Sequence, residues 1–324
     1  MARSRLETAL ADGALTLPDG PVRVLRPPSG YDVSALDPGR VTIAQGFRPD
    51  HDAWEAMGYR ADDATGAVAT IVVVPRSKAL ARALVADAVA TTAFVVVDGQ
   101  RTDGIDGLWR DLRARVGDIG SVTKAHGRLF WFDATGVDLS DWASAGPTAV
   151  RDGWITQPGV FAEGGPDRGS DALLAALPAK LPKRLVDLGA GWGYLSARIL
   201  ADHPEVAWID LVEAEILALD CARLNVTDDR ARFHWSDAMR WQPEGAVDAV
   251  VANPPFHTER RPDVALGQDF VAAAARILNG SGHLWLVANR HLPYEAALRE
   301  RFASVEETGG DAAFKVFHAQ RPRR

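Results

Sequence analysis

Short apolar runs alternate with amphipathic segments along most of the chain, and this alternation predicts an α/β protein. In the first half, residues 66–75 and 92–98 are almost continuously apolar, which is typical of buried strands. Residues 77–90, between them, carry apolar side chains at helical spacing. A short helix and a hairpin are predicted next, over 107–116 and over 121–124 with 128–132. Strands that alternate with helices indicate a largely parallel sheet.

The same alternation continues in the second half and predicts a doubly wound sheet, which binds ligands at the carboxyl ends of its strands. Its first strand leads into a glycine-rich turn at 189–193 and a helix over 194–200. Later strands are predicted over 207–213, 231–235, 247–252, 283–289 and 313–319, and helices over 263–278 and 293–302. Residues 279–282, Asn-Gly-Ser-Gly, are predicted to form the turn that ends the helix 263–278.

Two domains are predicted, over residues 1–145 and 150–324, and a chain of 324 residues is long enough for both. A stretch rich in Gly, Ala, Ser and Pro at 143–147 marks the approximate boundary. The first half contains neither a glycine loop nor an Asn-Pro-Pro motif, and residues 98–101 are interpreted as a simple turn. The first domain is therefore predicted to be a degenerate, non-catalytic copy of the second.

Acidic and glycine residues stand at the ends of successive predicted strands in the second half. The sequence Asp187-Leu188-Gly189-Ala190-Gly191-Trp192-Gly193 has a glycine spacing that differs from the GxGxxG dinucleotide fingerprint. Glu213 ends the next strand, where its carboxylate can accept hydrogen bonds from both ribose hydroxyls of an adenosine. Asp237 follows the third strand and is placed to accept from an adenine amino group. Together these positions predict an S-adenosylmethionine site and make a nicotinamide site the weaker interpretation.

The segment Asn253-Pro254-Pro255-Phe256 ends the fourth predicted strand. Two prolines fix two φ angles and remove two backbone donors, so the loop is rigid and offers carbonyl acceptors. The Asn253 amide oxygen and the Pro254 carbonyl can each accept a hydrogen from one planar amino group, and Phe256 offers a face for stacking. Asn-Pro and Pro-Pro are also ordinary turn signals. Because the motif follows the glycine loop by about 60 residues, it favours methylation of an exocyclic amine.

These motifs resemble those of class I S-adenosylmethionine-dependent methyltransferases. More narrowly, the chain resembles the two-domain, small-subunit ribosomal RNA guanine-N2 methyltransferases, on the segments Gln157–Phe161, Asp167–Ser170, Asn253–His257 and Phe314–Phe317. The resemblance implies two tandem Rossmann-like domains, the second with a seven-stranded sheet whose last strand is antiparallel. It departs from the family at Trp192, which is bulky for a glycine loop, and in a divergent stretch up to about residue 65.

The resemblance also implies roles for particular residues. The catalytic residues it implies are Asn253, Pro254, Pro255 and Phe256. Those implied to bind S-adenosyl-L-methionine are Asp187, Gly189, Gly191, Glu213, Asp237 and Asn253. The implied substrate is ribosomal RNA, most simply the 16S RNA of the small subunit, within a ribosomal subunit or an assembly intermediate.

Charge and composition modify this picture in two ways. The net charge is −7, with 16 basic against 19 acidic residues in 1–150 and 20 against 24 in 151–324. RNA-binding proteins usually carry a basic footprint, so any footprint here is local, and Arg260 and Arg261 are candidates. A single cysteine excludes an internal disulfide, and the histidines show no metal-ligand spacing. With no apolar run long enough to span a membrane and no signal-peptide core, we expect a cytoplasmic, metal-free monomer.

Four alternatives stay open at this level. The Asn-Pro-Pro-aromatic motif also serves adenine-N6 methyltransferases and enzymes that methylate a glutamine side chain of release factors. Like the guanine-N2 enzymes, both classes act on a planar amine. A non-catalytic RNA-binding assembly factor could keep the same scaffold. An NAD-dependent oxidoreductase is disfavoured by the glycine spacing.

Overall fold

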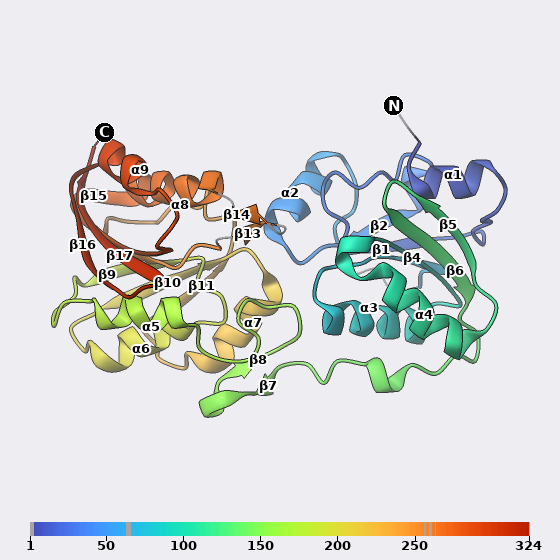
Figure 1. Ribbon diagram of the computed structural model, residues 1–324, viewed down its shortest axis with the longest axis horizontal. Coiled ribbons are helices and arrows are strands. Elements are labelled where there is room, and N and C mark those ends of the chain that lie inside the picture. The colour runs from blue at the N-terminus through green and yellow to red at the C-terminus, as the bar shows by residue number, and fades with distance from the viewer. Residues whose placement is uncertain (1–2, 63–65, 256, 259–260, 263, 324) are drawn as a thin grey trace. The chain divides into compact units, whose positions relative to one another are not determined.

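The computed structural model divides the chain into two compact units, Met1–Gly146 and Pro147–Arg324 (Figure 1). It describes residues 3–62, 66–255, 257–258, 261–262 and 264–323. Each unit contains one main sheet covered by helices. Within the part of the chain that is described, no helix has the length and apolar character that crossing a membrane requires.

The N-terminal unit is built on a six-stranded sheet in the order β2-β1-β3-β4-β6-β5. The first four strands are parallel, whereas β6 runs antiparallel to both β4 and β5. Its elements are α1 (Arg5–Ala11), β1 (Val22–Leu25), β2 (Val41–Ala44), α2 (Arg48–Ala56), β3 (Ala69–Val73), α3 (Lys78–Thr91), β4 (Phe94–Gln100), α4 (Ile105–Val116), β5 (Gly120–Lys124) and β6 (Gly127–Asp133).

The structure confirms the strands, helices and hairpin predicted between residues 66 and 132. Helix α3 begins after Ser77, whose hydroxyl accepts a hydrogen bond from the Leu80 N–H and so caps the helix. The interpretation of residues 98–101 as a turn was wrong, because Asp98 to Gln100 continue β4 through backbone pairing with β6. Strands β1 and β2 were not predicted, since each has only four residues. Their place in the sheet comes from pairing, of β2 with β1 and of β1 with β3.

The C-terminal unit contains a seven-stranded sheet in the order β11-β10-β9-β12-β15-β17-β16, with β17 antiparallel to both neighbours. This confirms the predicted α/β architecture with an antiparallel last strand. Its elements are β7 (Thr148–Ala149), β8 (Ile155–Thr156), α5 (Arg168–Ala175), β9 (Arg184–Leu188), α6 (Tyr194–Asp202), β10 (Trp208–Glu213), α7 (Ile216–Asn225), β11 (Ala231–Trp235), β12 (Val247–Ala252), β13 (His257–Thr258), β14 (Arg261–Pro262), α8 (Val264–Ile277), β15 (Leu278–Asn289), α9 (Glu295–Arg301), β16 (Phe302–Gly310) and β17 (Phe314–Pro322).

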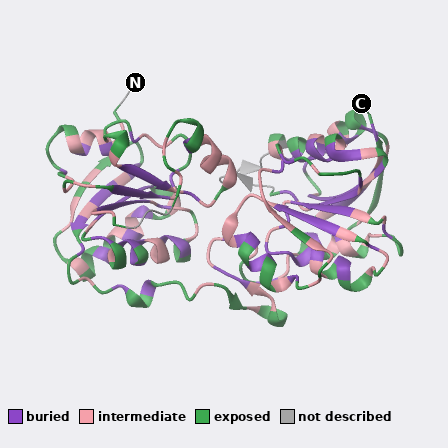
Figure 2. Cartoon of the chain, turned by 180° about the vertical axis from the view of Figure 1, so that it is seen from behind, coloured by how far each residue is buried: buried purple, intermediate pink, exposed green. Residues whose placement is uncertain are grey.

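Helices cover both faces of this sheet, and the strand residues alternate between them. Leu185 and Val251 pack with residues of α5, α6 and α7, while Val186 and Val250 pack with residues of α8 and α9. The strands are accordingly mostly buried and the outward helix faces exposed (Figure 2). Burying each such aliphatic side chain contributes about 1.5–3 kcal/mol, so these two layers hold the strand ends in place.

One local prediction for this unit was wrong, and one strand was not predicted. Residues 279–282 do not form a turn after the helix; they belong to β15. The start of this strand is irregular, because its pairing with β12 shifts register between Val247 and Ala249. Strand β16 was not predicted, because only two of its nine residues, Phe302 and Val305, are large apolar side chains. Its pairing with β17 supplies the order that the hydrophobic pattern lacks.

Candidate active site

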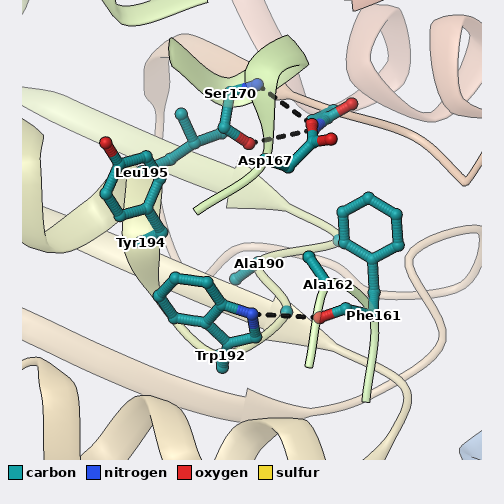
Figure 3. Close-up of a pocket in the computed structure, with 11 residues that line it drawn as sticks. Phe161, Ala162, Asp167, Ser170, Ala190, Trp192, Tyr194 and Leu195 are labelled. Carbon is teal, nitrogen blue, oxygen red and sulfur yellow. Dashed lines mark hydrogen bonds between the residues drawn. The ribbon is translucent and has the colours of Figure 1, made fainter. Parts of the chain in front are cut away.

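The candidate site lies where β9, β10 and β12 end. Strands β10 and β11 extend the sheet to one side of β9, and β12 and β15 extend it to the other. In an open α/β sheet this reversal leaves a crevice beyond the carboxyl ends of the strands. The pocket found there is lined by Phe161, Ala162, Asp167, Ser170, Gly189, Ala190, Gly191, Trp192, Tyr194, Leu195 and Asn253 (Figure 3).

The glycine loop between β9 and α6 needs glycine for two different reasons. Gly189, Gly191 and Gly193 all have positive φ, at +78°, +56° and +87°. A side chain at Gly193 would place its Cβ 2.8 Å from Val226, so this glycine permits α6 to pack closely on the neighbouring segment. A Cβ at Gly191 would meet nothing within 4 Å, which leaves its backbone open to a ligand.

Trp192 does not obstruct the loop. Its side chain is only 3% exposed and packs against Trp154 and Tyr194, with ring centroids 5.6 Å from each. The indole Nε1 donates to the carbonyl of Phe161 at 3.0 Å (Figure 3). The bulky residue of the loop therefore points into a small aromatic cluster and leaves the glycine backbone accessible.

Glu213 ends β10 with both carboxylate oxygens already oriented. Oε2 accepts from the Gly191 N–H at 2.8 Å, and Oε1 accepts from the Glu215 N–H at 2.7 Å. Burial raises the pKa of this carboxyl, and the backbone donors oppose the rise. Each oxygen retains a further lone pair, so Glu213 is a rigid acceptor for two neighbouring hydroxyls.

Asp187 is fully buried at the penultimate position of β9. Its Oδ2 accepts from the Ser196 hydroxyl at 2.7 Å, while Oδ1 has no hydrogen-bond partner among the described residues. Burial raises the pKa of this carboxyl to about 7, with a smaller contribution in the same direction from the charge of Glu213. A buried carboxyl with an unpartnered oxygen is suited to receive a donor or a positive charge from a ligand.

This raised pKa predicts a pH dependence of stability. The native state retains the Asp187 proton between about pH 4 and pH 7, where the unfolded chain has lost it, so the stabilisation by the protonated form disappears as pH rises through that window. We expect the unfolding free energy of Asp187→Asn, relative to the unmodified protein, to increase from pH 4.5 to pH 7.5. Urea unfolding at four pH values measures this, and parallel curves for the two proteins would contradict it.

Asn253 immediately follows β12, and its amide is held in one orientation. Nδ2 donates to Asp167 Oδ2 at 3.0 Å and to Ser170 Oγ at 2.9 Å. Because a carboxylate can only accept, the –NH2 group must face Asp167. The opposite atom, Oδ1, is buried and has no hydrogen-bond partner among the described residues. The site thus presents an oriented acceptor beside the glycine loop.

Asp167 and Ser170 lie in a segment that carries the family resemblance, but the sequence alone assigns no role to either residue. Asp167 caps the start of α5 by accepting from the N–H groups of Gly169 and Ser170 at 2.9 and 3.2 Å. Figure 3 shows the bond from Ser170. The same oxygen receives the Asn253 amide. An Asp before a helix signals a cap in the sequence, but its contact with a residue 86 positions away is a tertiary event.

The remaining predicted site residues lie around this centre. Asp237 follows β11, and its Oδ1 accepts from the Met239 N–H at 2.9 Å, which makes a local turn outside the pocket lining. Pro254 is buried and Pro255 is exposed. Phe256 and Arg260 lie outside the described residues, as does the side chain of Arg261.

The N-terminal sheet has the same strand order without a counterpart of β11, so that β1, β2 and β3 correspond to β9, β10 and β12. At the end of β1, the carbonyl of Pro27 accepts from Gln45 Nε2 at 2.8 Å and from Trp54 Nε1 at 3.0 Å. Both side chains are buried. After β3 the chain reads Val74-Pro75-Arg76, where Asn253-Pro254-Pro255 follows β12. Protein side chains thus bond to the loop that corresponds to the glycine loop.

Comparison with known proteins gives consistent matches. Ribosomal RNA small subunit methyltransferase C of Hahella chejuensis is 34% identical over 169 residues, which cover 52% of this chain and 49% of that protein. The protein of the same name from Shewanella pealeana is 30% identical over 260 residues, covering 76% and 75%. The chain spans about half the length of relatives such as the Hahella protein.

A solved structure shares the fold of both units. The T. thermophilus 16S rRNA N2 G1207 methyltransferase (RsmC), in complex with AdoMet and guanosine, matches with a TM-score of 0.78 at 23% identity, covering 95% of this chain and 90% of that one. The family model described as methyltransferase small domain matches residues 153–318, which include the glycine loop, Glu213 and Asn253. The chain therefore belongs to the methyltransferase small domain family.

Proposed function

We propose that this protein transfers a methyl group from S-adenosylmethionine to the exocyclic N2 amine of a guanine in small-subunit ribosomal RNA. The observation that carries the proposal is the fixed amide of Asn253, whose –NH2 group is bound by Asp167 and Ser170 and whose Oδ1 has no partner among the described residues. The names of the relatives from Hahella and Shewanella support the reaction class and the RNA substrate.

The residues at the strand ends fit S-adenosylmethionine. The open space at Gly191 admits a ligand against the backbone, Glu213 offers acceptors for ribose hydroxyls, and Asp187 has a free buried oxygen. Asp237 is proposed to accept from the adenine amino group through its Oδ2, since Oδ1 is already used. When bound, this cofactor supplies a methyl group activated by the neighbouring sulfonium.

Asn253 orients the acceptor amine. Its Oδ1 accepts one amine hydrogen, and the Pro254 carbonyl is proposed to accept the second, so that the nitrogen lone pair points out of the base plane. The Asp167 carboxylate polarises the Asn253 amide and strengthens Oδ1 as an acceptor of the positive charge that grows on the nitrogen. The rest of the catalysis is proximity and exclusion of water, with Phe256 proposed as a stacking face.

The N-terminal unit is proposed to be a non-catalytic copy of the methyltransferase fold that supports binding of RNA. Gln45 and Trp54 bond to the loop that corresponds to the glycine loop, and Val74-Pro75-Arg76 offers no side-chain amide. We further propose that the enzyme acts in the cytoplasm as a monomer on a ribosomal subunit or an assembly intermediate. Recognition of such a particle is compatible with a net charge of −7, because proteins already neutralise part of its RNA.

Transfer of tritiated methyl groups from S-adenosylmethionine tests this function directly. The substrates are small-subunit RNA and intact small subunits from cells that lack the gene, and nucleosides of the product are analysed. We expect label in N2-methylguanosine. Label in N6-methyladenosine would overturn the base assignment, and methylated glutamine in added release factor would move the function to protein. Absence of both label and cofactor binding would favour a non-catalytic assembly factor.

A further inference from the structure

Phe161 combines an exposed ring with a well-anchored backbone. The side chain is 55% exposed, the most of any large hydrophobic residue in the described ranges, although it lines the pocket that contains Asn253. Its phenyl ring points away from Trp192, while its carbonyl turns towards the indole (Figure 3). An aromatic ring left in water beside a site is a candidate ligand contact, because its exposure brings no folding benefit.

Hydrogen bonds fix the segment that carries this ring, although it contains little regular structure. Trp192 Nε1 donates to the Phe161 carbonyl at 3.0 Å, and the Thr156 hydroxyl donates to the Glu163 carbonyl at 2.6 Å. The Asn225 amide bonds both the N–H and the carbonyl of Ile155 at 2.8 Å each, and also donates to the carbonyl of Trp192 at 2.8 Å. The segment is therefore tied to the glycine loop on one side and to α7 on the other.

Trp192 connects the glycine loop to the segment that carries Phe161. Its backbone belongs to the glycine loop, its ring is buried against Trp154 and Tyr194, and its N–H bonds the Phe161 carbonyl. The position of the phenyl ring thus depends on an indole N–H within the cofactor loop. No other polar atom of this side chain exists to provide a second role.

We propose that Phe161 is a second stacking face for the acceptor base, in addition to the one proposed for Phe256, and that Trp192 is a positioning residue that holds it there; this inference rests on the proposed function. The hydrogen bonds proposed for the amine, to Asn253 Oδ1 and to the Pro254 carbonyl, hold one edge of the base and leave its faces without a partner. An aromatic face at the solvent side of the pocket defines the tilt and accepts a base that has left its helix. The glycine backbone and Glu213 remain for the cofactor.

Kinetics of four variants test the proposal with intact small subunits as substrate. Phe161→Ala and Phe161→Leu are expected to lower kcat/KM by about 10- to 100-fold, since base stacking contributes on that scale, whereas Phe161→Tyr retains it within about threefold. Trp192→Phe keeps an aromatic ring in the cluster but removes the N–H together with the five-membered ring that carries it. We expect it to lower kcat/KM by about five- to tenfold with the cofactor Kd unchanged, and to lower the thermal midpoint because the smaller ring leaves a cavity.

A double variant separates positioning from general packing. Trp192→Phe combined with Phe161→Ala should be no slower than Phe161→Ala alone, because the bond to the backbone acts through the ring. Additive losses would show that Trp192 acts elsewhere. An equal rise in cofactor Kd and loss of kcat/KM in Phe161→Ala would assign the ring to the cofactor and overturn the proposal, as would kcat/KM within twofold of the unmodified protein.

A binding measurement distinguishes failure of this inference from failure of the proposed function. The fluorescence of 2-aminopurine riboside, which carries a 2-amino group, is quenched by stacking and is recorded with S-adenosylhomocysteine present. We expect quenching by the unmodified protein and by Phe161→Tyr but not by Phe161→Ala. That result without methyl transfer to RNA would retain the stacking face and reject the proposed reaction. Methyl transfer with quenching that does not depend on Phe161 would do the reverse.

Discussion

Replacing Asn253 by alanine is expected to lower methyl transfer by about two to three orders of magnitude, while the cofactor Kd changes by less than about threefold. The substitution removes Oδ1, a buried side-chain acceptor that has no hydrogen-bond partner among the described residues. It also leaves Asp167 and Ser170 without their common partner, but no side-chain hydrogen bond among the described residues joins either group to the glycine loop. Single-turnover rates with saturating cofactor and calorimetric cofactor titration measure the two quantities separately.

Two further variants sharpen this prediction. Asn253→Asp keeps the shape but sets a carboxylate against Asp167, so we expect it to be as inactive as the alanine variant and less stable. Asn279→Ala is the matched control, because it loses an amide bond to Asp248 at 2.8 Å where β15 begins, at the opposite end of the sheet. Turnover of Asn253→Ala equal to that of the control would refute the catalytic assignment.

Replacing Glu213 by alanine is expected to weaken cofactor binding by about 10- to 150-fold, the scale of losing hydrogen bonds to a charged acceptor. Two effects act in the same direction. The carboxylate would no longer receive the ribose hydroxyls, and the N–H groups of Gly191 and Glu215 would lose the partner that orders the loop. Calorimetry with S-adenosylhomocysteine gives the change in Kd without requiring turnover.

Glu215→Ala provides the matched control for this change. Glu215 lies two residues away and caps α7 by accepting from the Leu217 N–H at 3.2 Å, so its loss costs helix stability, about 1 kcal/mol, and leaves the pocket lining intact. Glu213→Gln should fall between the two, because one of its ends becomes a donor facing a backbone N–H. If Glu213→Ala bound the cofactor as tightly as Glu215→Ala, Glu213 would not be a ribose ligand.

Local pattern was sufficient where strands and motifs are continuous in the chain. The strands β3, β4, β9, β10 and β12 are apolar on both faces because helices cover both sides of each sheet, and such runs are visible without a structure. The site residues at the ends of those strands could also be predicted, because the carboxyl ends of parallel strands meet at the same edge of a sheet. The sequence therefore predicted that Gly191, Glu213 and Asn253 share one site.

Strand pairings and side-chain contacts between residues distant in the sequence could not be predicted from local pattern. Strand β16 has too few large apolar residues to be recognised and depends on pairing with β17. In the same way, β1 depends on pairing with β3, and β2 on pairing with β1. Trp192 looked like an obstruction in the glycine loop, because the sequence does not state which way a side chain turns. In the structure its indole packs into an aromatic cluster and bonds the carbonyl of Phe161.

The sequence by itself determined the α/β class, the order of the elements around the site and the residue types at the strand ends, because hydrophobic periodicity and glycine spacing are local properties. Only the tertiary structure decided which amide atom of Asn253 is left without a partner. Asp167 and Ser170, 86 and 83 residues earlier in the chain, bind its –NH2 group, and its buried Oδ1 has no hydrogen-bond partner among the described residues. Such long-range pairing follows from packing α5 beside the end of β12, which no local pattern encodes.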